Sequence, residues 1–564
     1  MFAMIAFLSS TDTAQLLDSV GTGFIKVLDI RENPDPNNRD RVTQQIVGGL
    51  DLNENGKKEF LYVTDNTFSG GRDGGARGYS LFLYEYDPAS SSYKNIWYYS
   101  IEDTVGGSFP NFCVCDLNGD GHMEVALGVN YDAGMSHAGA TPNRLLIFEF
   151  GPGALPTEPI ATWNFDNPNP FGNTRPNALI AGDVDDDGQQ ELGIAFRAWN
   201  GSAKGVLIAS LQNSEYGLFT TFDKEVFDTT TATASIYGTA RITDMDNDGH
   251  KEFCFGYAGT PKIVFYEADA PNSYSRYEWN LATGTTFTSG TSFSMQQVDI
   301  DNDGKNELLI GSNSSAAADL YIVKGVTALE NFGPSNVFRI AHLPPAPNFS
   351  YTDEFRGLAA GDIDGNGKTD IFMCNGGRVW RFEYKGTGAI TDSASYNATI
   401  AYQDLTDGTR FRWVEFTGDV YSRAAGIPAG DMNGNGKAEL MICNQRGGYA
   451  DSTSSKIIIL ESTVAVVHVS SALGATPNGF ELRPCYPNPF NPSTTISFSI
   501  GSRSDVLMTI YNLLGQEITT LVSQSLTPGS YSVAWNAGNI PSGVYFCRIQ
   551  AGTFEQTQKL ILSK

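Results

Sequence analysis

The chain has 564 residues, of which 41% are hydrophobic, so it is long enough for more than one domain and for a large buried core. Its 63 acidic residues exceed its 37 basic residues, giving a net charge of −26. A surface this acidic repels nucleic acids and anionic lipids, which argues against either as a partner. No apolar run reaches the ~18 residues that a membrane-spanning helix needs. The carboxylates are therefore either solvated at the surface or gathered around metal ions.

The seven cysteines are an odd number without a CxxC pair, and a disulfide framework is not expected in a chain this large, although one pair remains open. Cys254, Cys374 and Cys443 lie in apolar runs, where a free cysteine behaves as a small hydrophobic residue. Cys113 and Cys115 alternate along one predicted strand and should share a face.

A nine-residue pattern, D-x-[DN]-x-[DN]-G-x-x-[DE], occurs seven times at intervals of 55 to 69 residues. A single copy would also fit an ordinary turn built from Asp, Asn and Gly. Seven copies at nearly even spacing indicate a structural repeat instead. The copies begin at Asp51, Asp116, Asp183, Asp244, Asp299, Asp362 and Asp431.

The flanks of the pattern repeat as well. A short apolar run precedes each copy and another follows it, as in NALIAGD ending at Asp183 and ELGIA starting at Glu191, which predicts a β-hairpin with the acidic loop at its tip. A third and a fourth run follow, as in LFLYEYD from Leu81 and NIWYYSI from Asn95. Four short strands per repeat without helical periodicity predict an all-β fold, a seven-bladed β-propeller over residues 21–463.

The ends of the chain complete this organisation. The last repeat lacks a fourth strand, because KIIILES (456–462) runs into a linker over residues 464–484. FIKVLDIRE, from Phe24 to Glu32, resembles a fourth strand, so we expect it to close the ring by completing the seventh blade, which removes an exposed sheet edge. The apolar start MFAMIAFLSS belongs either to the remnant of a signal peptide over residues 1–20 or to a disordered leader.

Each loop offers an all-oxygen ligand set. Positions 1, 3 and 5 supply side-chain oxygens, glycine at position 6 permits the backbone reversal, and position 9 is a carboxylate that can close the shell. Oxygen ligands in this number select Ca²⁺ over zinc or copper, so His122 and His250 at position 7 should face solvent. The expected ligands, with position 7 acting only through its backbone carbonyl, are Asp51, Asn53, Asn55, Lys57 and Glu59; Asp116, Asn118, Asp120, His122 and Glu124; Asp183, Asp185, Asp187, Gln189 and Glu191; Asp244, Asp246, Asp248, His250 and Glu252; Asp299, Asp301, Asp303, Lys305 and Glu307; Asp362, Asp364, Asn366, Lys368 and Asp370; and Asp431, Asn433, Asn435, Lys437 and Glu439.

The number of carboxylates predicts how tightly each loop binds. The loops at Asp183, Asp244 and Asp299 have four, whereas those at Asp51 and Asp431 have only two. We therefore expect the first group to bind Ca²⁺ most tightly and the second most weakly. Seven bound ions would bring +14 against the net charge of −26 and leave −12. The role expected for the metal is structural, because an ion that binds the folded hairpin stabilises the fold.

These loops and hairpins resemble the FG-GAP (VCBS-like) repeats of the integrin α-subunit propeller and of many secreted bacterial proteins. The resemblance implies a seven-bladed ring with calcium in the hairpin between the first two strands of a blade. Integrin propellers carry such loops in only some blades. Here every repeat has one, as in the bacterial relatives.

The composition changes after residue 480, where alternating strands separated by turn signals predict a small Ig-like β-sandwich over residues 485–564. This tail resembles the type A C-terminal sorting domain of the type IX secretion system. The resemblance implies export across the outer membrane of a Bacteroidota-like bacterium, with the secretion machinery as a partner, and a cleaved tail that leaves the propeller anchored or released. An ordinary sandwich without an address is the alternative. The matching residues are YPNPFNP (486–492), Ile510, Tyr511, Asn512, Leu514, Gly515, and SGVY (542–545), whereas Cys485 and Cys547 depart from the pattern.

The first functional hypothesis is a surface or secreted binding protein for a glycan or protein ligand. Four loops between second and third strands (65–80, 130–143, 196–204 and 445–455) should emerge opposite the calcium loops. They carry Arg and aromatic residues, which are typical binding anchors, although surface loops also vary without function. These residues are Arg72, Arg77, Tyr79, Tyr131, His137, Arg197, Trp199, Arg446 and Tyr449.

The alternative is a polysaccharide-degrading enzyme, since some calcium-bearing propellers are lyases. The sequence predicts no catalytic residues: it has no GxSxG, HExxH or phosphate-binding loop, and paired carboxylates occur only inside the metal loops. The five histidines are also scattered along the chain. A third possibility, a structural spacer, is disfavoured because spacers are usually tandem arrays.

Overall fold

A computed structural model describes residues 18–563 with gaps. The gaps longer than seven residues are 32–41, 66–78, 102–109, 130–143, 164–173, 212–221, 344–357, 417–430, 445–454 and 464–478, and shorter gaps occur elsewhere. The regular secondary structure of the described chain is almost entirely β-strand. Its only helices are three short 3₁₀ turns, at Leu329–Asn331, Pro334–Asn336 and Ser393–Ser395, so no described helix could cross a membrane.

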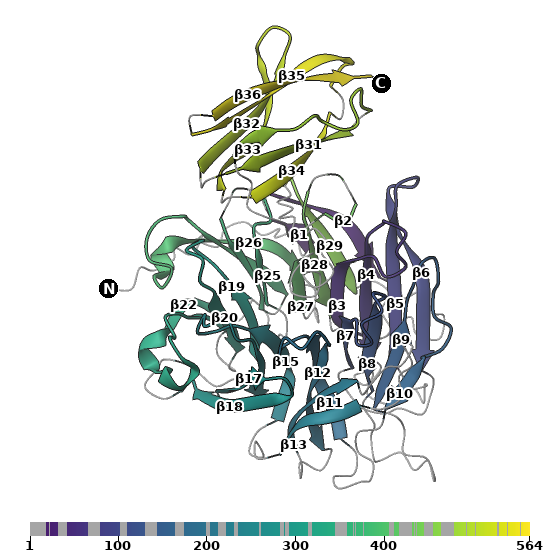
Figure 1. Ribbon diagram of the computed structural model, residues 1–564, viewed down its shortest axis with the longest axis vertical. Helices are drawn as coiled ribbons and strands as arrows, with labels where there is room; N and C mark the ends of the chain where they lie inside the picture. The colour runs from purple at the N-terminus through teal and green to yellow at the C-terminus, as the bar shows by residue number, and fades with distance from the viewer. Residues whose placement is uncertain are drawn as a thin grey trace.

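Seven antiparallel sheets, here called blades 1 to 7, make up the described part of residues 18–462 (Figure 1). Blade 1 contains β3 (Val42–Leu50), β4 (Glu59–Asp65), β5 (Tyr79–Asp87) and β6 (Ser92–Ile101); blade 2 contains β7 (Asn111–Cys115), β8 (Glu124–Gly128), β9 (Leu145–Glu149) and β10 (Ala161–Trp163); blade 3 contains β11 (Thr174–Gly182), β12 (Glu191–Ala198), β13 (Lys204–Leu211) and β14 (Phe222–Asp228); and blade 4 contains β15 (Ser235–Thr243), β16 (Glu252–Ala258), β17 (Lys262–Ala270) and β18 (Ser273–Asn280). Blade 5 contains β19 (Phe293–Val298), β20 (Glu307–Asn313), β21 (Ala318–Val323) and β22 (Val337–Leu343); blade 6 contains β23 (Leu358–Gly361), β24 (Asp370–Asn375), β25 (Arg378–Tyr384), β26 (Tyr396–Asp404) and the N-terminal β1 (Asp18–Val20); and blade 7 contains β27 (Phe411–Phe416), β28 (Glu439–Asn444), β29 (Ile457–Ser462) and β2 (Phe24–Ile30).

The blades form a closed ring, which makes this part of the chain a β-propeller. The first strands of successive blades contact one another in the series β3, β7, β11, β15, β19, β23 and β27, and β27 in turn contacts β3. The buried apolar side chains follow the same order, because each cluster joins neighbouring blades and one cluster joins blade 7 to blade 1. The core of the ring is thus a set of interfaces between sheets, as expected where one face of a sheet must pack on the next.

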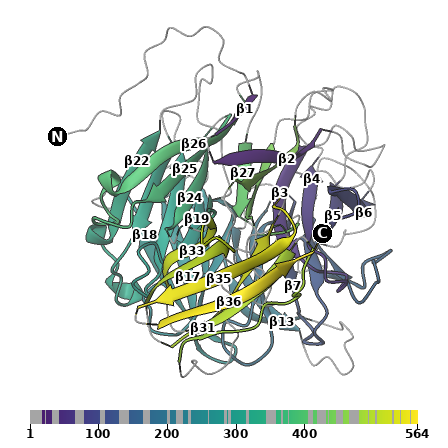
Figure 2. The ribbon, with the colours of Figure 1, turned by 90° about the horizontal axis from the view of Figure 1, so that it is seen from above.

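The N-terminal strands lie on the last two blades (Figure 2). β2 pairs antiparallel with β29, from Phe24 opposite Ser462 to Ile30 opposite Ile457, so the segment expected to complete the seventh blade does so. β1, which the sequence does not indicate, pairs with β26 as a fifth strand of blade 6. Gly21 joins the two strands at a point of close approach, where a Cβ atom would lie 1.9 Å from the carbonyl oxygen of Ile400.

All seven cysteines are free and buried, so no disulfide forms. Cys113 and Cys115 both belong to the apolar cluster between blades 2 and 3, and therefore share one face of β7.

The tail is a separate β-sandwich. One sheet contains β30 (Glu481–Leu482), β31 (Ser493–Ile500) and β34 (Gly529–Asn536), and the other contains β32 (Ser504–Asn512), β33 (Glu517–Leu526), β35 (Gly543–Ala551) and β36 (Phe554–Leu562). Its core contains only residues from Phe480 onward. Among them are Trp535 and Phe490, together with Cys485 and Cys547, the two cysteines that do not fit the sorting-domain pattern. The tail therefore has a core of its own, as an independent domain requires.

Candidate metal centres

The seven acidic loops all connect the first and second strands of a blade. In blade 3, for example, Asp183 follows β11 and Glu191 begins β12. The loop reverses by placing two residues in the left-handed region, Asp186 with φ of 57° and Gly188 with φ of 92°. Only glycine adopts the second conformation without strain, which explains why position 6 is invariant among the seven copies. The same pair of positive φ angles occurs at Glu54 and Gly56, Gly119 and Gly121, Asn247 and Gly249, and Asn302 and Gly304.

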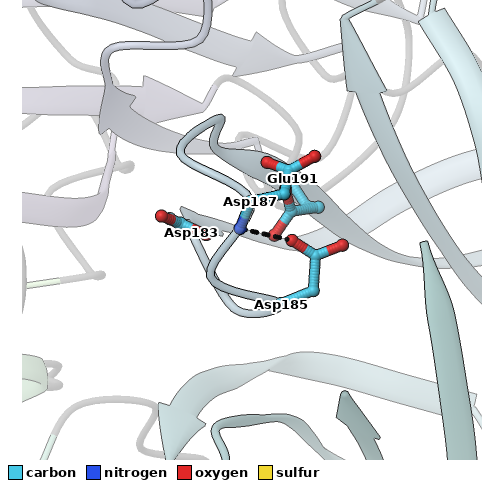
Figure 3. Close-up of side chains that lie close together, drawn as sticks. All are labelled: Asp183, Asp185, Asp187 and Glu191. Carbon is cyan, nitrogen blue, oxygen red and sulfur yellow. Dashed lines mark hydrogen bonds between the residues drawn. The ribbon is translucent and has the colours of Figure 1, made fainter. Parts of the chain in front are cut away.

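Backbone amides orient the loop side chains. In the loop at Asp183, the amide of Gly188 donates to Asp183 Oδ2 at 3.2 Å and that of Gln189 donates to Asp187 Oδ1 at 2.8 Å. The amide of Asp187 donates to Asp185 Oδ1 at 3.2 Å (Figure 3). One oxygen of each carboxylate is thus tied to the loop backbone. The other oxygen of Asp185 accepts from the amide of Asn272 at 2.6 Å, whereas Asp183 Oδ1 is buried without a partner.

The carboxylate at position 9 is buried and only half satisfied. Glu191 has no exposed surface, and its Oε2 accepts from the amide of Val184 at 2.8 Å, whereas its Oε1 is buried without a hydrogen-bond partner. Glu59 and Glu124 have the same arrangement, and Asp183 Oδ1 is likewise buried without a partner. Buried unpaired carboxylate oxygens are costly, so these loops have the donor set and the unsatisfied atoms that a bound cation requires.

Burial raises the pKa of the position 9 carboxyl groups, because the charged form loses its hydration. The pKa rises to about 8 at Glu59, Glu191 and Glu252, and to about 9 at Glu124, where repulsion from Asp116 adds to the rise. A cation among the loop oxygens would favour the ionised form of each group.

Five of the seven loops bring at least three carboxylates together, with ligand atoms within 4.8 Å of one another. All of their donors are oxygens, which suits Ca²⁺. The five groups are Asp183, Asp185, Asp187 and Glu191; Asp116, Asp120 and Glu124; Asp244, Asp246 and Asp248; Asp299, Asp301 and Asp303; and Asp362, Asp364 and Asp370. In the described chain, the Asn-rich loops at Asp51 and Asp431 form no such group.

A further side chain, which the nine-residue pattern does not contain, faces each loop from the third strand of its blade. Sheet register places Glu85 opposite Glu59, Glu149 opposite Glu124, and Glu267 opposite Glu252. Burial and repulsion from Asp246 and Asp248 raise the pKa of Glu267 to about 7, so this carboxylate belongs to the loop electrostatically. The equivalent acids are Glu383 opposite Asp370 and Glu461 opposite Glu439.

Blades 3 and 5 differ at this third-strand position. In blade 3, Ala209 pairs with Leu192, so the residue opposite Glu191 is Ser210. The carboxylate near this loop comes instead from Glu225 in the fourth strand, where Glu225 is the extra residue of a β-bulge. Burial and the nearby charges of Asp185 and Asp187 raise the pKa of Glu225. In blade 5 the position is Lys324, directly after the paired Val323.

Of the two histidines at position 7, His250 is exposed and His122 is half-buried. His122 Nδ1 lies 2.6 Å from Oε1 of Glu54 in the neighbouring loop, and the backbone amide of His250 donates to Asp248 Oδ1 at 2.8 Å. Neither imidazole belongs to the carboxylate groups described above.

The expected ligand-binding loops lie mostly outside the described residues, including Arg72, Arg77, Tyr131, His137, Trp199, Arg446 and Tyr449. Tyr79 was expected in a ligand-binding loop, but it lies in a strand. It is the first residue of β5, is 1% exposed and belongs to the apolar cluster between blades 1 and 2. Its aromatic ring therefore serves packing and is not available as an anchor.

The blades are antiparallel sheets in a closed ring, and each blade has an acidic hairpin loop. The fold is therefore a β-propeller built from sequence repeats, followed by a separate β-sandwich. Residues 362–442 match the FG-GAP-like repeat, a span that includes the loops at Asp362 and Asp431. Residues 484–563 match the secretion system C-terminal sorting domain. The chain therefore contains an FG-GAP-like repeat within its β-propeller and a C-terminal sorting domain, which implies secretion or export to the cell surface.

No curated protein matches the chain. Among solved structures, PorZ, a surface component of the type IX secretion system of Porphyromonas gingivalis, is 13% identical with a TM-score of 0.39, over 90% of this chain and 58% of PorZ. The Dos1 propeller is 10% identical with a TM-score of 0.34, over 79% of this chain and 96% of Dos1. A family 43 arabinoxylan arabinofuranohydrolase from Bacillus subtilis is 10% identical with a TM-score of 0.25, over 95% of this chain and 99% of the hydrolase. With TM-scores below 0.5, nothing about the ligand or activity of this chain follows from these likenesses.

Proposed function

We propose that the protein is an exported calcium-binding β-propeller that acts as a binding module for a glycan or another protein at or beyond the cell surface. The observation that carries the calcium assignment is a buried, unpartnered carboxylate oxygen at position 9 in a loop that also brings at least three carboxylates together, as at Glu124 and Glu191. The sorting domain supports export through the type IX machinery, after which the propeller is either anchored or released.

The calcium has a structural role in this proposal. An ion held by side chains from position 1 to position 9 would fix the hairpin between two strands and neutralise its carboxylates. Binding to the folded state alone stabilises a protein by about 2.7 kcal/mol when the free ligand is at 100 times its Kd. In solutions of millimolar Ca²⁺, thermal unfolding should occur at a higher temperature than in chelator, and Mg²⁺ should raise it less, because it demands a smaller octahedral site. An equal midpoint with Ca²⁺ and with chelator would contradict the assignment.

The binding role is tested by presenting the full chain to arrays of glycans and of bacterial surface proteins, with Ca²⁺ and again with chelator. Calcium-dependent binding to one ligand class supports the proposal. Failure of the folded, calcium-loaded protein to bind either class would refute it.

The competing function is a polysaccharide-degrading enzyme. Within the described residues, the groups of three or more acidic side chains lie in the metal loops, where a cation would hold them ionised and unsuited to donate protons. Release of new reducing or unsaturated ends from a polysaccharide would establish the enzyme in place of the binding module.

A further inference from the structure

The third-strand position opposite position 9 decides the charge inside each loop. In blades 2 and 4 it is Glu149 or Glu267, but in blade 5 it is Lys324. The Lys324 ammonium lies 2.9 Å from Glu307 Oε1, 3.1 Å from Asp301 Oδ2 and 3.6 Å from Asp303 Oδ2. A lysine therefore lies among the carboxylates that the repeat pattern assigns to a metal ion.

The ammonium and a calcium ion would compete for the same oxygens. Glu307 Oε1 is the atom equivalent to Oε1 of Glu191, and both are buried without a hydrogen-bond partner, but in blade 5 the Lys324 ammonium lies 2.9 Å from this oxygen as an ion-pair partner. A divalent ion at this place would also lie within a few ångströms of the ammonium, and the two would repel each other in a partly buried site. Lys324 is only 28% exposed, so its charged end is not simply solvated.

Three other loops have a basic side chain of their own. In blade 6, Arg381 donates from Nε to Asp370 Oδ1 at 2.6 Å and from its terminal nitrogen to Asp364 Oδ2 at 2.6 Å. In blade 1, Lys57 lies 2.5 Å from Glu85. In blade 7, Lys437 lies 2.9 Å from Glu461.

The amides of the Asn-rich loops reinforce this arrangement. Asn53 and Asn55 both donate their side-chain N–H groups to Glu85 Oε2, and Asn433 and Asn435 donate theirs to Glu461 Oε2 in the same way. The carboxylate opposite position 9 is thus already satisfied by neutral and cationic donors in blades 1 and 7.

The loops at Asp116, Asp183 and Asp244 have no such cation. In the described part of the chain, no lysine or arginine forms an ion pair with their ligand-position carboxylates. The ammonium of Lys251 bonds instead to the position 4 side chain Asp186 and to the carbonyl of Asp183. These loops also receive an additional carboxylate, from Glu149, Glu225 and Glu267 respectively.

We infer that calcium binds only to these three loops. Lys324 takes the place of the ion in the loop at Asp299, and Arg381 does so in the loop at Asp362. The loops at Asp51 and Asp431 are excluded because, in the described chain, neither brings three carboxylates together. The inference rests on the proposed calcium binding and assigns it to particular blades. From its four carboxylates alone, the loop at Asp299 was expected to bind Ca²⁺ tightly. We now expect this loop to bind no ion, because of Lys324.

The first test is the number of calcium ions bound per full-length chain, measured by equilibrium dialysis in millimolar Ca²⁺ followed by elemental analysis. Three ions are expected. No bound ion would refute the metal role itself, whereas four or more would leave that role intact and overturn the restriction to three blades.

The second test compares two substitutions at the same loop position. Asp248→Asn in blade 4 should lower the count from three ions to two, whereas Asp303→Asn in blade 5 should leave it at three. A loss of one ion in Asp303→Asn would show that the loop at Asp299 binds metal and would overturn the inference.

A third test creates a site. Lys324→Glu introduces the acidic residue that blades 1, 2, 4, 6 and 7 have at this position, and should raise the count from three to four. Lys385→Glu is the matched control, because Lys385 is exposed and lies two residues beyond the equivalent position of the next blade. A folded Lys324→Glu protein that still binds three ions would show that Lys324 is not what excludes the metal.

Discussion

In Glu124 and Glu191, the two oxygens of the position 9 carboxylate have different roles. Oε2 of Glu191 ties the end of the loop to the amide of Val184, while Oε1 has no partner within the protein. The first role concerns local folding and the second concerns the ion. A substitution that keeps the hydrogen bond from Val184 but removes the negative charge should therefore separate the effect on folding from the effect on calcium binding.

Glu191→Gln is that substitution, because the amide oxygen can still accept from Val184. We expect calcium affinity at this loop to fall at least about tenfold, a loss of about 1.4 kcal/mol, and the chain to bind one ion fewer at limiting Ca²⁺. In chelator the thermal midpoint should not fall, since the neutral amide avoids a buried unpaired charge. Calorimetry with and without Ca²⁺ measures both effects. Glu158→Gln, at an exposed carboxylate outside the loops, should change neither, and an equal loss in chelator would contradict this division of roles.

Gly188 contributes backbone conformation alone. A Cβ atom there would meet nothing within 4 Å, but the residue has φ of 92°. Gly188→Ala should cost roughly 1–2 kcal/mol of stability from strain in the left-handed region, and the loss should persist in chelator. Gly479→Ala, at another position with open space but without positive φ, is the control in the same thermal unfolding measurement. A loss that vanished in chelator would assign the effect to metal binding and contradict the strain argument.

The ligand positions could be predicted because all of them lie within nine consecutive residues. The third-strand partner could not, because its distance from position 9 ranges from 13 residues (Asp370 to Glu383) to 26 residues (Glu59 to Glu85). That distance depends on the length of the intervening loop, which the strand pattern does not restrict. Lys324 therefore has no recognisable sequence signal, and neither does Glu225, which reaches its loop through a β-bulge.

At the scale of the strand, β2 links the beginning of the chain to its last blades. Phe24 is 6% exposed and packs against Phe372 of blade 6, with ring centroids 6.1 Å apart. The guanidinium of Arg381 lies 5.8 Å from the centre of the same ring. This single side chain therefore connects the closing strand to the adjacent blade as well as to its own.

Phe24→Ala should lower the free energy of unfolding by about 3 kcal/mol or more, as the loss of a buried aromatic ring usually does. Val27→Ala, on the same strand but 36% exposed, should change it by less than about 0.5 kcal/mol. Chemical denaturation of both variants checks the difference. Equal and small effects would mean that β2 adds little to the stability of the ring.

The closing strand could be predicted from its likeness to the fourth strands of other repeats. β1 could not, because three residues carry no recognisable periodicity and pair with β26, which is distant in the sequence. Tyr79 shows a related limit. An aromatic residue at the boundary of a loop and a strand suits both binding and packing, and only the start of β5 decides between them.

At the scale of the whole molecule, the propeller and the tail have separate apolar cores. We expect two thermal transitions in the full chain, of which Ca²⁺ raises only the one that belongs to the propeller. Trp535→Ala should lower only the other transition, since Trp535 is 3% exposed and packs against Phe490 and Tyr545 of the tail. Differential scanning calorimetry resolves the two. A single transition that moves with both changes would show that the domains unfold together.

The pairing of β2 with β29 also determines when the propeller can be finished. β2 leaves the ribosome early, but its partner begins at Ile457, and synthesis of the intervening chain at about 5–20 residues per second takes on the order of 20–90 s. Throughout that interval β2 has no strand to pair with, whereas each of blades 1 to 5 can form from consecutive segments. The entropic cost of joining such distant ends grows only slowly with length, so waiting time and not chain length is the obstacle.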